Sequence, residues 1–152
     1  MKKTILTFSL MIAVLLFSNG SNAQELKWYG FNEGYTKATK ENKVMLIDVY
    51  TDWCGWCKKM DKDTYAKKTI IELVNKDFIA VKLNPEADGE YTYNGKKYNG
   101  QQLVGVLTSN KLSGYPTTCF HFPKTKKNYM EVGYKGVEDM TSLIIKYAKM
   151  KL

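Results

Sequence analysis

The residues best suited to chemistry are Cys54 and Cys57, three positions apart in the segment Trp-Cys-Gly-Trp-Cys-Lys at 53–58. The apolar run 44–50 predicts a buried strand, and the breaker-free run after the cysteines predicts a helix. We therefore expect Cys54 at a helix start, where unpaired N–H groups and the helix dipole favour a thiolate. Such a position typically lowers a cysteine pKa from about 8.5 to about 3.5–7.5, and the thiolate attacks disulfides. Because Cys57 lies on the same helix face, the pair predicts a reachable site of thiol–disulfide exchange.

This stretch resembles the active site of the thioredoxin superfamily, and the resemblance spans roughly 26–152, nearly all of the chain beyond its N-terminus. The matching segments are 48–58 for the active-site strand and helix start, 81–84 for the third strand, 114–117 for the cis-proline loop, and 132–133 for the last strand. The resemblance implies an α/β thioredoxin fold, with a central mixed sheet of about five strands flanked by helices. The chain departs from thioredoxins at Trp56, where they have proline, and in the extra residues after Asn84.

Asp48 lies six residues before Cys54 in the most apolar predicted strand. A carboxylate buried there is costly without a partner or a task, and burial should raise its pKa. The resemblance makes Asp48 the buried acid that assists proton transfer to and from Cys57, with Lys82 on the neighbouring strand as its charge partner. A solvated position at the strand end is the alternative for Asp48.

The resemblance also implies a peptide-binding surface around the cysteines. Pro116 is expected to be a cis proline that faces them, and Tyr115 to offer backbone hydrogen bonds to an extended peptide. Trp53 and Trp56 are expected to frame the attacking sulfur with apolar surface. Core packing is the alternative for Trp53, whereas Trp56 is expected to be exposed. On local grounds alone, Pro116 reads as an ordinary turn proline.

A structural disulfide or half of a zinc site is the alternative for the cysteine pair. Zinc needs about four ligands, and the remaining soft candidates, Cys119 and His121, would point the same way from one strand. Neither has a usual ligand spacing, so we expect no metal. We expect Cys119 to be a buried, inert thiol and His121 to be a satisfied strand residue.

The first 23 residues read as a cleaved signal peptide. Lys2 and Lys3 are followed by the apolar stretch 5–17 and by small residues before a cleavage point near Ala23. This stretch of thirteen residues, with Thr7 and Ser9 as its polar members, is too short for a membrane-spanning anchor, which is the alternative. We therefore expect export to the periplasm or another extracytoplasmic space, where disulfides persist.

The mature chain, 24–152, reads as one thioredoxin-like domain. Without Lys2 and Lys3, the 23 basic residues become 21, against 15 acidic ones, for a net charge of about +6. The lysines are scattered and no nucleic-acid motif accompanies them, so we expect a soluble, monomeric protein that binds no nucleic acid.

Alternating strands and helices support the α/β fold. We expect strands at 26–31, 44–50, 78–83, 117–122 and 129–134, and helices at 33–43, after Cys54, at 69–75, 101–107 and 137–152. The unusual segment is the insert 85–100, where Asn94-Gly95 predicts a hairpin between two tyrosine-rich runs. The insert either packs on itself at the surface or presents its tyrosines to a partner.

The sequence thus predicts an exported thiol–disulfide oxidoreductase that acts on protein disulfides, as a reductant. The sulfur pair carries the electrons, so we expect no nicotinamide or flavin cofactor, and no glycine-rich dinucleotide turn is present. The resemblance implies a membrane-embedded thiol reductase as electron donor. The alternatives are a disulfide oxidase or isomerase, whose direction depends on reduction potential. A non-catalytic thioredoxin-fold module that binds a partner or a metal also stays open.

Overall fold

The computed structural model describes residues 25–150, and the expected signal peptide at 1–23 lies outside this range. In chain order the elements are β1 (Trp28–Tyr29), α1 (Phe31–Glu41), β2 (Val44–Val49), α2 (Gly55–Met60), the π-helix η1 (Asp61–Tyr65), α3 (Lys68–Asp77), β3 (Phe78–Leu83), β4 (Tyr91–Tyr93), β5 (Lys96–Tyr98), α4 (Gly100–Leu107), β6 (Thr117–Phe122), β7 (Lys127–Val132) and α5 (Val137–Lys149). None of the helices in 25–150 is long and apolar enough to cross a membrane.

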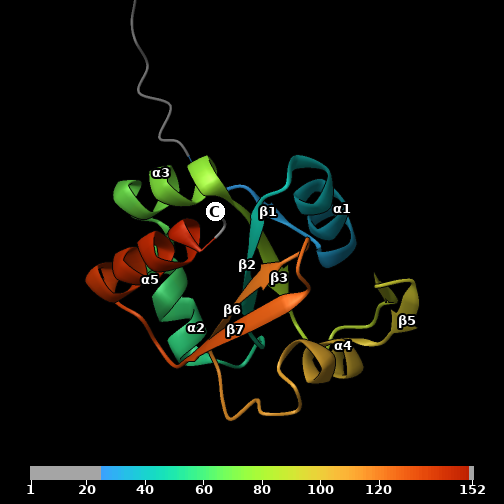
Figure 1. The fold of residues 1–152 in the computed structure, drawn as a ribbon. Helices are drawn as coiled ribbons and strands as arrows, with labels where there is room; N and C mark the ends of the chain where they lie inside the picture. Colours follow the sequence, from blue (N-terminus) through green and yellow to red (C-terminus); the bar gives the residue numbers. More distant parts are fainter. Residues whose placement is uncertain (1–24, 151–152) are drawn as a thin grey trace, which may run out of the picture.

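A five-stranded mixed sheet forms the centre of the fold, with the strand order β1-β3-β2-β6-β7. Strands β1, β3 and β2 are parallel, whereas β6 and β7 run antiparallel to their neighbours. Helices α2, α3 and α5 cover one face, and α1 and α4 cover the other (Figure 1). The expected α/β fold is confirmed. Strand β2 is buried along its whole length because both faces of the sheet are covered.

The position of Asp48 follows from the alternation of side chains along β2. Val44 and Leu46 belong to the hydrophobic cluster under α3 and α5, whereas Met45 and Ile47 belong to the cluster under α1 and α4. Asp48 therefore points to the face that carries α2, η1, α3 and α5. This is the face on which the segment after the cysteines packs.

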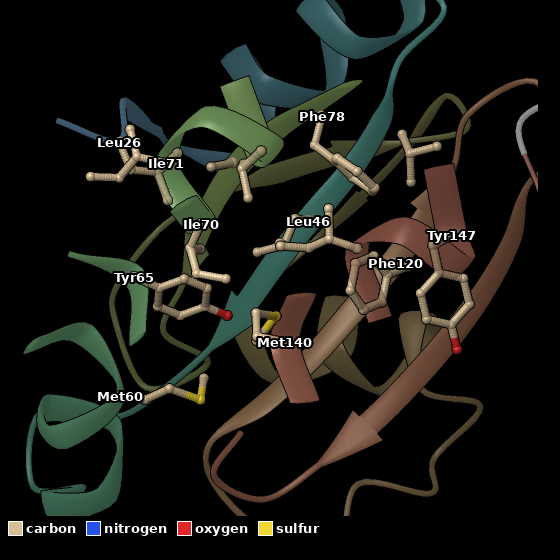
Figure 2. Close-up of a cluster of buried hydrophobic side chains, with 14 of the residues drawn as sticks. Leu26, Leu46, Met60, Tyr65, Ile70, Ile71, Phe78, Phe120, Met140 and Tyr147 are labelled. Carbon is tan, nitrogen blue, oxygen red and sulfur yellow. The ribbon is translucent and has the colours of Figure 1, made fainter. Parts of the chain in front are cut away.

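The cluster on that face anchors the active-site helix to the core (Figure 2). Met60 and Tyr65, from the chain that follows the cysteines, are buried beside Leu46 of β2. Phe120 of β6 stacks on Tyr147 of α5, with ring centroids 4.1 Å apart. Met60 and Tyr65 thus hold the helical segment after the cysteines against the sheet.

The first predicted strand, 26–31, is wrong in extent. Only Trp28 and Tyr29 pair in the sheet, and Phe31 begins helix α1. The apolar side chain of Phe31 is buried under helix α1, and Phe31 does not pair in a strand. Helix α1 lies close to the sheet, since a Cβ added at Gly34 would lie 2.4 Å from Val81 Cγ2.

Two other predicted boundaries also differ. The helix after Cys54 does not run straight into 69–75, because a π-helical turn, η1, separates α2 from α3. Strand β7 occupies 127–132 rather than 129–134, since the turn after β6 is short and β7 pairs with β6 immediately after it. The remaining predicted strands and helices are confirmed to within a few residues.

The insert 85–100 forms the predicted hairpin of β4 and β5, with Asn94 and Gly95 at positive φ angles of 51° and 76°. Besides the pairing of its own two strands, the insert packs on helix α1. Tyr91 and Tyr93 both face Phe31 of α1, and Tyr93 is fully packed into that cluster. The expectation that the insert packs only on itself is therefore wrong, because Tyr91 and Tyr93, two apart on one strand, share the face that meets α1. Contact of the insert with a partner stays a prediction.

The two ends of the insert meet at its base. A Cβ added at Gly100 would lie 2.6 Å from the carbonyl oxygen of Pro85. Gly100 begins helix α4, and Asn99 before it forms a capping box with Gln102. The chain thus leaves the core after β3 and returns to almost the same point at α4.

Replacing Gly95 with alanine should lower the free energy of unfolding by about 1 kcal/mol, because a side chain disfavours a positive φ. No atom lies within 4 Å of the added Cβ, so the effect reports backbone conformation alone. Urea denaturation measures it. Gly114→Ala, which also has open space but no positive φ, is the matched control. Equal losses in the two variants would contradict the assignment.

Candidate active site

Cys54 and Cys57 form a disulfide at the start of helix α2. The backbone N–H of Cys57 donates a hydrogen bond to Cys54 Sγ at 3.1 Å, so Cys54 caps the helix with its sulfur. Helix α2 runs directly into η1, which lengthens the helical segment behind the sulfur. Upstream, Cys54 N donates to the carbonyl of Thr51, which fixes the turn between β2 and the helix. An N–H aimed at this sulfur would stabilise its thiolate after reduction.

The oxidised pair is less accessible than the sequence suggested. Cys54 keeps only 5% of its surface exposed, and Cys57 is more deeply buried. The surface around them is apolar, because Trp53 is 67% exposed and Trp56 is 59% exposed. Core packing, the alternative for Trp53, is therefore wrong. With so little of Cys54 exposed, a partner must approach closely to reach its sulfur.

Trp53 connects three loops of the site. Its ring contacts Tyr115 edge-on at 5.8 Å between centroids, and its Nε1 donates to the Glu86 carboxylate at 2.9 Å. Tyr115 precedes Pro116 in the proline loop, and Glu86 is the second residue of the insert. Trp56 lies against Tyr134, which follows β7, with 5.5 Å between ring centroids.

The peptide bond between Tyr115 and Pro116 is cis. The carbonyl of Pro116 accepts a hydrogen bond from Gly133 N at 2.8 Å, and Thr117 Oγ1 donates to the carbonyl of Gly114. The proline loop is thus fixed at both ends. The contact between Trp53 and Tyr115 brings this loop against the active-site turn.

Asp48 is fully buried and pairs with Lys82, which lies opposite it in the register of β2 and β3. Lys82 Nζ donates to Asp48 Oδ2 at 2.6 Å, while Oδ1 has no protein partner within 25–150. Burial raises the pKa of Asp48 to about 6, although Lys82 opposes the rise. Burial lowers the pKa of Lys82, but the neighbouring carboxylates outweigh it and hold the pKa above its usual value. The solvated alternative for Asp48 is wrong.

Several residues at the site were not singled out from the sequence for the chemistry. Asp61 accepts a second hydrogen bond from Lys82, and Glu86 anchors Trp53. The aromatic rings of Trp28 and Tyr50 lie 4.7 and 5.0 Å from Lys82 Nζ. Asp61 had a usable signal, because it lies four residues after Cys57 on the same helical face. Glu86 had no such signal, because the match to the thioredoxin pattern ends where the insert begins.

Cys119 and His121 lie on β6 away from the disulfide, in the half of the core under α1. Burial raises the pKa of Cys119 to about 12. His121 Nδ1 is 2.7 Å from Asn128 Oδ1, and burial lowers the pKa of the imidazole. Within 25–150, no group of three or more His, Cys, Asp or Glu side chains is placed to hold a metal.

In the reduced protein, iodoacetamide near neutral pH should alkylate Cys54 and leave Cys119 unmodified. A thiol with a pKa of about 12 is almost never ionised there, and its burial excludes the reagent. Peptide mass spectrometry locates the label, and urea-unfolded protein, in which Cys119 must react, is the control. Labelling of the folded protein at Cys119 as fast as at Cys54 would contradict its inert role.

Comparisons with known proteins agree with this geometry. Residues 16–146 match the Thioredox_DsbH family, described as a protein of unknown function, DUF255. The solved structure of a DsbH oxidoreductase superposes with a TM-score of 0.62 and 18% identity, covering 83% of this chain and 86% of the other. At this identity the likeness concerns the fold alone.

Two curated relatives are similar in sequence over shorter stretches. Spermatogenesis-associated protein 20 of Homo sapiens is 35% identical over 60 residues, which are 39% of this chain and 8% of the human protein. A protein disulfide-isomerase of Schizosaccharomyces pombe is 29% identical over 124 residues, which are 82% of this chain and 29% of the yeast protein. The chain thus spans less than a third of either relative. With the family match over most of its length, a thioredoxin-like fold and a Cys-X-X-Cys disulfide at a helix start, the chain belongs to the Thioredox_DsbH family.

Proposed function

We propose that this chain is a thiol–disulfide oxidoreductase that exchanges its Cys54–Cys57 pair with disulfides of other proteins. The observation that carries the proposal is the cysteine pair itself. Its sulfurs are joined at a helix start, and the Cys57 N–H is aimed at Cys54 Sγ. A purely structural disulfide would not require a buried acid on the face of the sheet that carries the helix, nor the exposed indoles of the neighbouring residues Trp53 and Trp56.

In the reductive direction, the Cys54 thiolate attacks one sulfur of a substrate disulfide. A Cys54–substrate bond forms, and the other substrate sulfur leaves as a thiolate. Cys57 then loses its proton to Asp48 and attacks Cys54 Sγ, which restores the Cys54–Cys57 bond and releases the second substrate thiolate. Two electrons pass from the cysteine pair to the substrate. Asp48 suits this role because, with a pKa of about 6, it is ionised at neutral pH and accepts a proton readily.

The substrate is proposed to bind as an extended segment beside the proline loop. Tyr115 and Pro116 would offer backbone hydrogen bonds, and Trp53 and Trp56 would shield the reacting sulfurs from water. The exposed indoles support this assignment, since large exposed aromatic side chains are typical of binding surfaces. Main-chain pairing would make side-chain selectivity broad. The sulfur pair supplies the electrons, so the exchange needs no further cofactor.

The proposed setting is extracytoplasmic, after removal of the leader near Ala23, with the mature chain a monomer. There the pair would act as a reductant, with a membrane-embedded thiol reductase as its source of electrons. Equilibration with glutathione tests the direction. A potential near the value of thioredoxin, about −270 mV, supports a reductant, whereas one near about −120 mV identifies an oxidase.

An insulin-reduction assay with dithiothreitol tests the activity. The wild-type protein should accelerate insulin precipitation, and Cys54→Ser should fall to the uncatalysed rate because the attacking sulfur is gone. Cys119→Ser is the matched control, since it removes a thiol outside the site, and it should keep wild-type activity. Equal rates for wild type and Cys54→Ser would overturn the proposed function.

A further inference from the structure

Lys82 forms ion pairs with two carboxylates, Asp48 and Asp61. Its ammonium group donates to Asp48 Oδ2 at 2.6 Å and also to Asp61 Oδ1. The two carboxylates approach it from different elements, because Asp48 lies on β2 and Asp61 is the first residue of η1. One positive charge is therefore shared by two negative ones. Asp48 receives less stabilisation from Lys82 than an exclusive pair would give.

The two carboxylates differ sharply in their exposure to solvent. The side chain of Asp48 is 1% exposed, whereas that of Asp61 is 45% exposed. Asp61 and Lys82 both line an open cavity of about 520 Å³, together with Glu25, Leu26, Trp28, Tyr65, Ala66 and Ile71. Water therefore reaches Asp61 and one side of Lys82, while Asp48 stays behind them.

The placement of Asp61 depends on the local helix geometry. It stands where α2 changes into the π-helical turn η1, and such turns occur frequently at functional sites. Tyr65 at the end of η1 is buried beneath it and bonds Thr118 of β6 through its hydroxyl at 3.2 Å. The turn is thus fixed to the sheet at one end and presents Asp61 to Lys82 at the other.

We propose that Asp61 is a positioning residue that controls the charge of Asp48 by competing with it for the Lys82 ammonium. The titratable groups that face Asp48 are Lys82 from β3, Asp61 and Tyr65 from η1, and Tyr50 after β2. Among these, Lys82 is the basic group and Asp61 the acidic one, and burial raises the pKa of both tyrosines, which keeps them neutral. While Asp61 is ionised, it holds part of the Lys82 charge and repels the Asp48 carboxylate. Both effects keep a proton on Asp48 to higher pH.

This inference rests on the proposed function only for its consequence. If Asp48 accepts the Cys57 proton, then Asp61 decides the pH below which the second exchange step slows. A neutral residue at this position would let Lys82 pair with Asp48 alone. Asp48 would then ionise at lower pH, and exchange would persist further into the acidic range.

Asp61→Asn tests the inference, because it removes the charge and keeps the shape. Asp63→Asn is the matched control, since Asp63 lies two residues on in the same turn but pairs with exposed Lys59 at 2.5 Å. The readout is the Asp48 carboxyl carbon, titrated by NMR in the oxidised protein. We expect the titration midpoint to fall by about one pH unit in Asp61→Asn. It should stay unchanged in Asp63→Asn and return towards wild type in Asp61→Glu.

An unchanged midpoint in Asp61→Asn, or an equal fall in Asp63→Asn, overturns the inference. This titration needs no catalytic turnover, so its result is independent of the proposed function. The pH profile of insulin reduction is the second readout. If the NMR midpoint falls in Asp61→Asn but the acidic limb of insulin reduction stays in place, the proposed proton transfer from Cys57 to Asp48 is overturned, and the role of Asp61 stands. A wild-type protein without activity overturns the proposed function instead, and the NMR midpoint still decides the role of Asp61.

Discussion

Cys57→Ser protein mixed with a disulfide substrate is expected to accumulate as a mixed disulfide through Cys54 and to turn over no further. The first attack needs only the Cys54 thiolate, which Cys57 N–H still faces in the variant. The second attack needs the Cys57 sulfur, and serine is too weak a nucleophile to replace it. We expect steady-state insulin reduction to fall by at least about 10³-fold, as for other nucleophile deletions.

Intact-protein mass spectrometry measures this trapping, because the variant should gain the mass of one substrate chain. Dithiothreitol should remove that mass. Cys54→Ser is the control and should gain none, since Cys57 is the more deeply buried of the pair. If Cys57→Ser stays unmodified while Cys54→Ser is trapped, the roles of the two cysteines are reversed.

Asp48→Asn is expected to stabilise the protein at neutral pH while it slows exchange. The ordinary pKa of 3.8 applies in the unfolded chain, and burial raises it to about 6 in the folded state. An acid whose pKa is raised on folding favours the folded state while it is protonated. This contribution is complete below the unfolded pKa and is lost as the pH rises through about 6. At about 1.4 kcal/mol per pH unit, the ionised group costs about 3 kcal/mol at neutral pH.

Asparagine stays neutral at every pH, so the gain in unfolding free energy should approach 3 kcal/mol near neutral pH and vanish near about pH 4. Urea denaturation at the two pH values measures it. Asp52→Asn, an exposed carboxylate in the turn before the helix, is the control and should change little at either pH. A gain that is equal at both pH values would show that packing, rather than ionisation, separates the variant from the wild type.

Most of the active site was predictable from the sequence because its signals are local. An apolar strand, a Cys-X-X-Cys pair and a breaker-free run fix where the cysteines lie, and Asp48 stands out as a charge in an otherwise apolar run. Its partner Lys82 followed from the resemblance, whereas the register that sets the two residues opposite each other came only with the structure. The sequence predicted a reachable sulfur and did not reveal that Cys54 keeps only 5% of its surface exposed.

The features that were missed arise from contacts between distant segments. Phe31 read as the end of a strand because an apolar residue looks the same whether a strand or a helix buries it. Tyr91 and Tyr93 read as surface residues because the partner that covers them, helix α1, lies some sixty positions earlier in the chain. The bond between Asp61 and Lys82 also depends on a local change of helix type, for which the sequence has no marker.

Because Pro85 and Gly100 lie against each other, the insert leaves and re-enters the thioredoxin-like core at one place. Because the two ends of the insert meet, its length does not affect the distance between the end of β3 and the start of α4. A loop of different length can therefore be grafted between Pro85 and Gly100 without distorting β3 or α4. Tyr93 sets the limit of such a graft, because it is buried against Phe31 of α1: a replacement loop that keeps this tyrosine preserves the core, and one that lacks it uncovers part of that core.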